Sequence, residues 1–214
     1  MNREELTLHV KHRGLLRTGF VYMLRALRRL INFDVMVVET AAGGPTGSPL
    51  VEPYVTRQIT ADEYRQGIRL LGEEHERPWA FDREDRCFAN LLDSRLVGYQ
   101  FYANQSTTIR AGLEFGFPDS LTYVYASFTH SDHRGQRLAQ SRADARRHAD
   151  QAQGIEREVV WYVSVDNLAA RAANRRIRPR KIGYIGYVRI RGRFFCYASP
   201  GCKRAGVSLV STSS

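Results

Sequence analysis

The chain has 214 residues, of which 43% are hydrophobic and 25% are charged, so it is long enough to bury the core of one domain with accessory segments. No run approaches the roughly 20 apolar residues of a membrane-spanning helix, and neither repeats nor low-complexity segments occur. The net charge of +10 and the pI near 9.9 favour an anionic partner such as nucleic acid, anionic lipid or a phosphorylated ligand. A genomic bias toward arginine over lysine is the alternative explanation.

Cysteine usage and the N-terminal sequence indicate a cytoplasmic protein. Cys87, Cys196 and Cys202 are odd in number and lack the spacing of metal ligands, so we expect reduced thiols and no metal site. The first residues lack the basic-then-apolar order of a secretory signal.

Residues 13–33 read as a basic amphipathic helix. Its arginines occupy much of the face that apolar residues leave open. Two interpretations remain: the helix packs on its own domain, or it docks to a partner or to an anionic membrane surface, which would make the protein peripheral to the inner membrane. The apolar positions recur every three or four residues: Leu16, Phe20, Met23, Leu24, Leu27, Leu30 and Ile31.

The other elements follow in chain order. A linker dense in turn-forming residues at 41–52 separates an N-terminal segment, 1–40, from a domain at 53–207, and the Ser-rich end, 208–214, is predicted to be disordered. Thr60 and Glu63 have capping-box spacing before a helix to about residue 76, and a short helix is expected at 83–91. Strands are expected at 34–39, 54–59, 95–102, 113–117, 121–128, 158–165, 182–190 and 193–197.

The segment 121–174 is the most informative part of the chain. The strand at 121–128 runs into a polar turn that opens a helix at 135–153, and a second strand at 158–165 runs into Asp166 and Asn167. A turn at a helix N-terminus presents unpaired N–H groups and a positive dipole end, which together bind anions, most often phosphate. Nearby arginines strengthen that expectation.

The turn reads Arg134-Gly-Gln-Arg-Leu-Ala139, and with it the chain resembles the GNAT superfamily of acyl-CoA-dependent N-acyltransferases. The family's pyrophosphate loop reads Arg/Gln-x-x-Gly-x-Gly/Ala. Arg134, Gly135 and Ala139 match, whereas Arg137 replaces the central glycine. The resemblance covers roughly residues 93–191.

The resemblance implies a mixed α/β fold with a central, mostly antiparallel sheet, in which two parallel strands splay around the cofactor and helices flank the sheet. These strands are 121–128 and 158–165, joined by the helix 135–153 as a right-handed crossover. The implied activity is transfer of an acetyl or longer acyl group from acetyl-CoA or another acyl-CoA to a primary amine, without a metal. The cofactor-binding residues it implies are Phe128, Thr129, Arg134, Gly135, Gln136, Arg137, Leu138, Ala139 and Asn167.

Acyl transfer also needs a polarised thioester carbonyl and a route for the amine proton. In the family a backbone amide at a strand bulge polarises the carbonyl, which here falls near residues 126–128. Glu114 and His130 are the expected catalytic residues, with Asp132 and His133 as further candidates. For each of them, an ordinary surface or hydrogen-bonded role is the alternative. The tyrosine that often acts as general acid in the family is replaced by Asn174.

Two other functions stay open at this point. A GNAT fold that has lost catalysis and serves as a CoA-binding sensor or scaffold would account for Arg137 and Asn174. A nucleic-acid-binding protein would suit the charge and the aromatic residues among arginines at 187–197, although no helix-turn-helix or zinc-finger motif is present. The partners expected are an amine-bearing acceptor, with acyl carrier protein and a second copy of the chain as further options.

Overall fold

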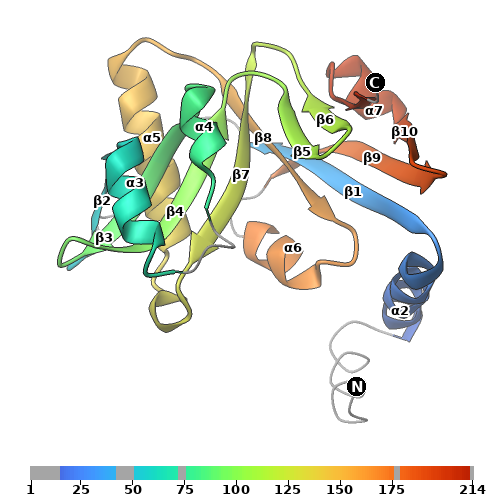
Figure 1. Cartoon of the computed structure of the whole chain (residues 1–214), viewed down its shortest axis with the longest axis horizontal. Helices are drawn as coiled ribbons and strands as arrows, with labels where there is room; N and C mark the ends of the chain where they lie inside the picture. The colour runs from blue at the N-terminus through green and yellow to red at the C-terminus, as the bar shows by residue number, and fades with distance from the viewer. Residues whose placement is uncertain (1–14, 42–50, 72–75, 176–178, 213–214) are drawn as a thin grey trace. The chain divides into compact units, whose positions relative to one another are not determined.

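The computed structural model describes residues 15–41, 51–71, 76–175 and 179–212 (Figure 1). The described helices are α2 (Leu15–Leu30), α3 (Ala61–Ile68), α4 (Pro78–Asp82), α5 (Leu138–Ala152), α6 (Leu168–Asn174) and α7 (Pro200–Arg204). The strands are β1 (Asn32–Ala41), β2 (Val55–Ile59), β3 (Arg86–Leu92), β4 (Arg95–Ala103), β5 (Thr107–Arg110), β6 (Leu113–Gly116), β7 (Leu121–Thr129), β8 (Glu158–Ser164), β9 (Arg180–Ile190), β10 (Arg193–Ala198) and β11 (Ser208–Ser211).

Hydrogen bonds join eight strands in the order β10-β9-β1-β8-β7-β4-β3-β2 and three in the order β11-β6-β5. The larger sheet is mostly antiparallel, with one parallel pair, β7 and β8. The predicted mixed fold with its parallel pair is therefore confirmed. The chain divides into two compact units: unit 1 comprises 1–39, 108–116 and 162–214, and unit 2 comprises 40–107 and 117–161.

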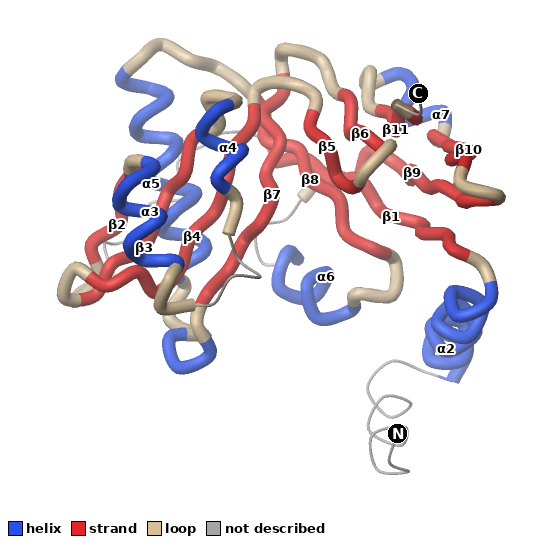
Figure 2. The backbone as a smooth tube through the Cα atoms, viewed as in Figure 1, coloured by secondary structure: helices blue, strands red, loops and turns tan. Residues whose placement is uncertain are grey.

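Unit 2 has one helical layer on each face of its strands. The helices α3 and α4 lie in front of β3 and β4, and α5 lies behind them (Figure 1), while Figure 2 shows the neighbouring strands in red. Aromatic rings fill the space beneath α3 and α4: the Tyr64 ring lies 5.4 Å from that of Tyr99 and 5.2 Å from that of Phe101. This aromatic cluster also receives Tyr125 and Phe128 of β7, so it extends to the strand on which the site is built.

The start of α3 is determined locally. Thr60 accepts a hydrogen bond from the Glu63 amide, and the Glu63 carboxylate accepts one from the Thr60 amide at 2.8 Å, which is the predicted capping box. The helix ends at Ile68, and the predicted continuation to residue 76 crosses 72–75, which lie outside the described residues.

In unit 1, α2 is tied to the strand ends by one arginine. Arg28 donates to Asp166 at 2.5 Å and to Ser164 at 2.8 Å, and it also pairs with Asp34. Large apolar side chains of α2 remain exposed beside the buried Leu24, as does Ile31 directly after the helix; those of α2 are Phe20, Met23 and Leu27. Docking of this helix to a membrane or a carrier protein stays a prediction, and among the described helices none is long and apolar enough to cross a bilayer.

Two of the predicted elements described here differ from the structure. The helix expected at 83–91 is wrong: residues 86–92 form β3, in which the four consecutive residues Cys87–Asn90 are all buried, so the run shows no period that would separate a strand from a helix. The helix of that region is α4, which begins with Pro78. The disordered tail is wrong for 208–211, because β11 pairs with β6 and buries Leu209. The predicted linker at 41–52 lies mostly outside the described residues, and the domain boundaries stay predictions.

Candidate functional site

A bulge interrupts β7 at the position expected for the carbonyl-polarising amide. Tyr99 of β4 pairs with Phe128, and Phe101 pairs with Tyr125, so one residue of β4 faces two of β7, Ala126 and Ser127. Ala126 has a φ of 49°, which turns the backbone away from the regular ladder. The bulge therefore redirects backbone groups over residues 126–128, as the resemblance implies.

The parallel pairing beside this bulge is short. Leu121, Thr122 and Tyr123 of β7 pair with residues 158–160 of β8. In the part of the chain that the structure describes, the pairing goes no further than Tyr123. The part of β7 that carries the bulge is therefore not paired with β8 in the described residues.

The loop that follows β7 contains two left-handed residues. Gly135 has a φ of 84°, and Arg137 has φ 56° and ψ 21°. Glycine enters this region freely, whereas a residue with a Cβ pays about 1–2 kcal/mol. Arg137 thus adopts the conformation suited to the motif's glycine, at a steric cost. A left-handed residue cannot continue into a right-handed helix, so α5 begins at Leu138 and the predicted start at 135 is wrong.

The N-terminus of α5 presents amide groups and positive charge. No side chain caps the first turn, and the first helical bonds run from the amides of Gln140 and Ser141 to the Arg137 carbonyl, at 3.0 and 3.1 Å. Leu138 is buried and anchors the turn, while Arg134, Arg137 and Ala139 are exposed. The Arg134 Nε donates to the Thr129 carbonyl at 3.1 Å, which folds the loop back on the end of β7.

A buried polar network ties α5 to the sheet. The guanidinium of Arg142 donates to the Asn90 side-chain oxygen, to Thr129 Oγ1 at 3.2 Å and to Ser127 Oγ at 3.4 Å. The Asn90 amide donates in turn to Ser141 Oγ at 2.9 Å. The bulge, the loop and the first turns of α5 are therefore held together by side chains from three elements.

Gly98 of β4 makes room for this arginine. A Cβ at Gly98 would lie 2.5 Å from Arg142 Nη1 and 3.0 Å from the Phe128 carbonyl oxygen. Burial lowers the pKa of Arg142 to about 10, since its partners are neutral and no described carboxylate pairs with it. Glycine at position 98 is therefore explained by packing, because a larger residue would collide with Arg142.

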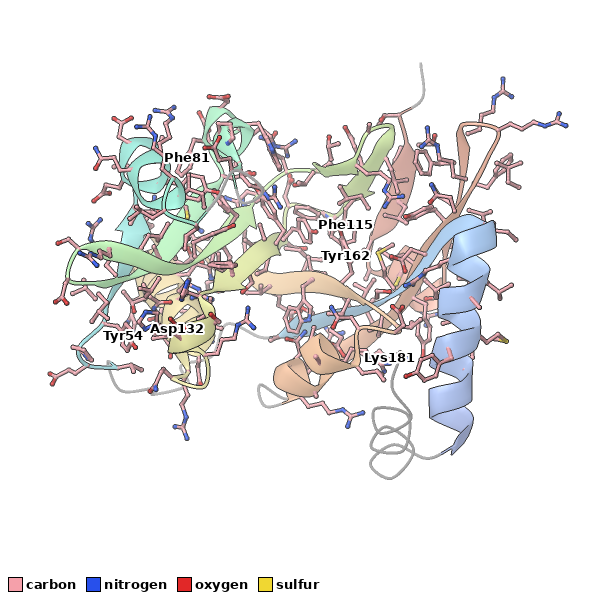
Figure 3. All side chains as sticks on the ribbon, turned by 60° about the horizontal axis from the view of Figure 1, so that its bottom comes forward. Tyr54, Phe81, Phe115, Asp132, Tyr162 and Lys181 are labelled. Carbon is pink, nitrogen blue, oxygen red and sulfur yellow. The ribbon has the colours of Figure 1, made fainter. Side chains whose placement is uncertain are left out.

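The titratable residues of the loop lie on its surface. His130 is 42% exposed, and its Nδ1 lies 3.8 Å from Asp132, which is 77% exposed. His133 Nδ1 lies 3.0 Å from the Tyr54 hydroxyl; Tyr54 and Asp132 are both labelled in Figure 3. His130 therefore belongs to the exposed turn beyond β7, and its catalytic role stays a prediction.

The remaining predicted site residues belong to unit 1. Asn167 accepts a hydrogen bond from the Ala170 amide at 3.1 Å and so caps α6, at whose end Asn174 lies. Glu114 is a half-buried residue of β6 opposite Val210 of β11. The ring of its neighbour Phe115 lies 5.3 Å from that of Tyr162, and the two are labelled side by side in Figure 3. Their roles stay predictions.

Three residues on or bonded to β7 near the bulge carry no signal in the sequence. Arg142 looked like one of many helix arginines, and Tyr125 looked like one of several aromatic residues of a strand. Asp85 falls inside the helix predicted at 83–91, whereas in the structure it directly precedes β3. No local pattern marks these residues, because each gains its partner from a segment distant in sequence.

Acyl-CoA suits the residues present in unit 2. A pyrophosphate would meet uncapped amides at the start of α5, the exposed Arg134 and Arg137, and open space at Gly135, where a Cβ would touch nothing within 4 Å. Among the described residues, no three His, Cys, Asp or Glu side chains form a group that could hold a metal ion.

Comparisons with known proteins agree with this geometry. The model of the Acetyltransferase (GNAT) family matches residues 54–176. A search of curated proteins finds no match. Similar solved structures include a putative GNAT-family acetyltransferase from Novosphingobium aromaticivorans, with 16% identity over 85% of this chain and a TM-score of 0.48. They also include a GCN5-related N-acetyltransferase from Kribbella flavida, with 14% identity over 85% of this chain and the same TM-score.

The chain spans 66% and 61% of the lengths of these two proteins. The glucosamine-6-phosphate N-acetyltransferase of Arabidopsis thaliana is 14% identical over 59% of this chain and 91% of its own, with a TM-score of 0.40. These distant likenesses add nothing to the match of the family model, which covers more than half of the chain. The chain belongs to the GNAT acetyltransferase family.

Proposed function

We propose that the protein is an N-acyltransferase that moves an acetyl or longer acyl group from acyl-CoA to a primary amine. The observation that carries the proposal is the left-handed turn at Gly135 and Arg137, which opens α5 with uncapped amides directly after the β7 bulge. Family membership supports acetyl-CoA as the donor. The acceptor, a cytoplasmic location and a carrier-protein or membrane partner for α2 remain predictions.

Different residues of unit 2 would bind the pyrophosphate and the thioester of the donor. The amides of Leu138 and Ala139, with Arg134 and Arg137, would hold the pyrophosphate. The redirected amides of 126–128 would hydrogen-bond the thioester carbonyl and stabilise the negative charge that develops on it. Arg142 of α5 would hold the helix N-terminus in place relative to the bulge, since its guanidinium donates to both Ser127 and Thr129 of β7.

Calorimetry with acetyl-CoA, CoA and longer acyl-CoAs tests the donor site. Ala139→Asp is the informative variant because the exposed position tolerates the side chain while a carboxylate there repels the pyrophosphate. We expect binding in the micromolar range, about −8 kcal/mol, to weaken at least tenfold in the variant. Ala139→Ser is the matched control and should bind nearly as the parent does. Absence of binding to every acyl-CoA would refute the donor assignment.

A second candidate is a CoA-binding protein without turnover, favoured by Asn174 at the position of the family's tyrosine. A panel of primary amines with saturating acetyl-CoA separates the two, through release of the free thiol. Thiol release that depends on an amine supports the transferase. Tight binding with no release above the uncatalysed rate across the panel supports the second candidate.

A further inference from the structure

A buried carboxylate and a tyrosine hydroxyl meet directly before the β7 bulge. The Tyr125 hydroxyl donates to Asp85 Oδ2 at 2.6 Å, and Asp85 is only 4% exposed. Asp85 lies between α4 and β3, and its amide donates to the Ala80 carbonyl at 2.9 Å. The next residue after Tyr125 is Ala126, whose positive φ makes the bulge. The pair therefore adjoins the backbone assigned to the thioester carbonyl.

The hydrogen bonds and the neighbouring charge of Asp85 only partly offset the burial of its carboxylate. Its Oδ1 has no hydrogen-bond partner among the residues described, and Arg83 Nε stands 3.7 Å from Oδ2 while the same guanidinium donates to the Ser106 carbonyl. Burial raises the pKa of Asp85, whereas the Tyr125 hydrogen bond and the Arg83 charge act in the opposite direction. The carboxylate is thus a better proton acceptor than a surface aspartate.

The Tyr125 ring is held rigidly. Phe101 stacks on it at 5.5 Å and 27°, and Trp79 stacks at 5.8 Å and 14°. Trp79 is 37% exposed, so this stack reaches the surface. Burial and the bond to Asp85 raise the pKa of the Tyr125 phenol, and the nearby Cys87 acts in the same direction. The hydroxyl therefore stays protonated, and it can pass a proton on only as it receives another.

We propose that Tyr125 and Asp85 form the proton relay that deprotonates the acceptor amine, an inference that rests on the proposed function. As the amine nitrogen bonds to the acyl carbon, its proton passes to the Tyr125 oxygen and the Tyr125 proton passes to Asp85. The carbon–sulfur bond then breaks, and the relay runs backwards to return the proton through Tyr125 to the departing thiolate or to water. The products are the amide and the free thiol, and both residues end as they began.

The relay pair differs in burial from the predicted catalytic residue His130. His130 is 42% exposed and lies in the turn that follows β7, whereas Asp85 is only 4% exposed. Asp85 and Tyr125 share unit 2 with the bulge and the loop. A buried carboxylate with one strong hydrogen bond and an unused oxygen is costly to the fold, which is typical of a group retained for function.

The test uses Tyr125→Phe and Asp85→Asn in the full chain. Each is expected to lower kcat about 100- to 1,000-fold, the usual contribution of a positioned base, with the acetyl-CoA Kd within twofold of the parent. In the parent, kcat should rise with pH through the pKa of Asp85, and Asp85→Asn should lose this acidic limb. Tyr102→Phe removes a buried hydroxyl that has no hydrogen-bond partner among the described residues, on the neighbouring β4, and should leave kcat unchanged.

The outcomes separate the relay from the proposed function. A kcat within threefold of the parent in both variants, or an unchanged acidic limb in Asp85→Asn, overturns the relay. Failure of the parent itself to bind acyl-CoA overturns the proposed function instead. If a thermal scan of Asp85→Asn shows no unfolding transition, this variant is not folded and the kcat of Tyr125→Phe is the test of the relay. Tyr125→Phe is expected to fold, because phenylalanine keeps the ring stack with Phe101 and Trp79.

Discussion

Arg137 holds a left-handed backbone conformation that a glycine would adopt with less strain, so Arg137→Gly should stabilise the fold. Removing the Cβ relieves about 1–2 kcal/mol of steric cost, and the extra freedom of glycine in the unfolded chain returns about 0.5–1 kcal/mol. The net gain is then about 0–1.5 kcal/mol. For a chain of this size, that corresponds to a rise in Tm of up to about 6 °C.

The same change should weaken donor binding. A charge-assisted hydrogen bond from the exposed guanidinium to a phosphate contributes about 1.5–3 kcal/mol, and its loss raises the Kd of acetyl-CoA roughly 10- to 150-fold. Thermal unfolding of the free protein and calorimetry at physiological salt measure the two effects separately. Stability and affinity are thus expected to move in opposite directions.

Two controls belong with this experiment. Arg137→Lys keeps the charge and the strain, so its Tm should match that of the parent and its affinity should fall less. Gly135→Ala adds a Cβ that meets nothing within 4 Å, so only the φ of 84° opposes it, and the Tm should drop by a few degrees. A fall in Tm for Arg137→Gly would refute the strain argument, and an unchanged Kd would refute the phosphate contact.

Gly98→Ala should lower the free energy of unfolding, measured in urea, by about 1–3 kcal/mol. Adding Arg142→Met should recover part of this loss, because the shorter side chain leaves room for the new Cβ. If the two changes in unfolding free energy simply add, the packing of Arg142 against Gly98 is contradicted. Hydrogen bonds from Arg57 and from the Thr60 amide lower the pKa of Glu63 to about 2. The ionised Glu63 therefore contributes its full stabilisation above the ordinary pKa of a glutamate, and this contribution is lost as the pH falls through 2. Glu63→Gln should therefore cost stability at pH 7, less than about 1 kcal/mol for so exposed a group, and the difference should shrink toward pH 2; a constant difference would argue against it. Leu209→Ala should cost about 2–4 kcal/mol if β11 is a strand, whereas no loss would favour a disordered tail.

Short sequence patterns predicted those elements whose stabilising interactions are made between residues close together in the chain. The capping box needs only Thr60 and Glu63, three residues apart. The turn between β9 and β10 uses Arg191 and Gly192, with φ values of 48° and 85°, and its position is readable from an Arg-Gly pair between two apolar strands. The proposed pyrophosphate loop was predicted in the same way, from a short run in which spacing and residue type match the family motif.

Tertiary structure decided what depends on burial and on distant partners. Residues 86–92 became a strand because both faces are covered, and residues 208–211 became one because β6 offered an edge. The Arg142–Asn90 and Tyr125–Asp85 hydrogen bonds join residues that are 52 and 40 positions apart in the sequence, so no local sequence pattern predicts them. The proposed donor loop could therefore be predicted from the sequence, whereas the proposed proton relay required the fold, because a carboxylate gains its proton affinity from the environment that buries it.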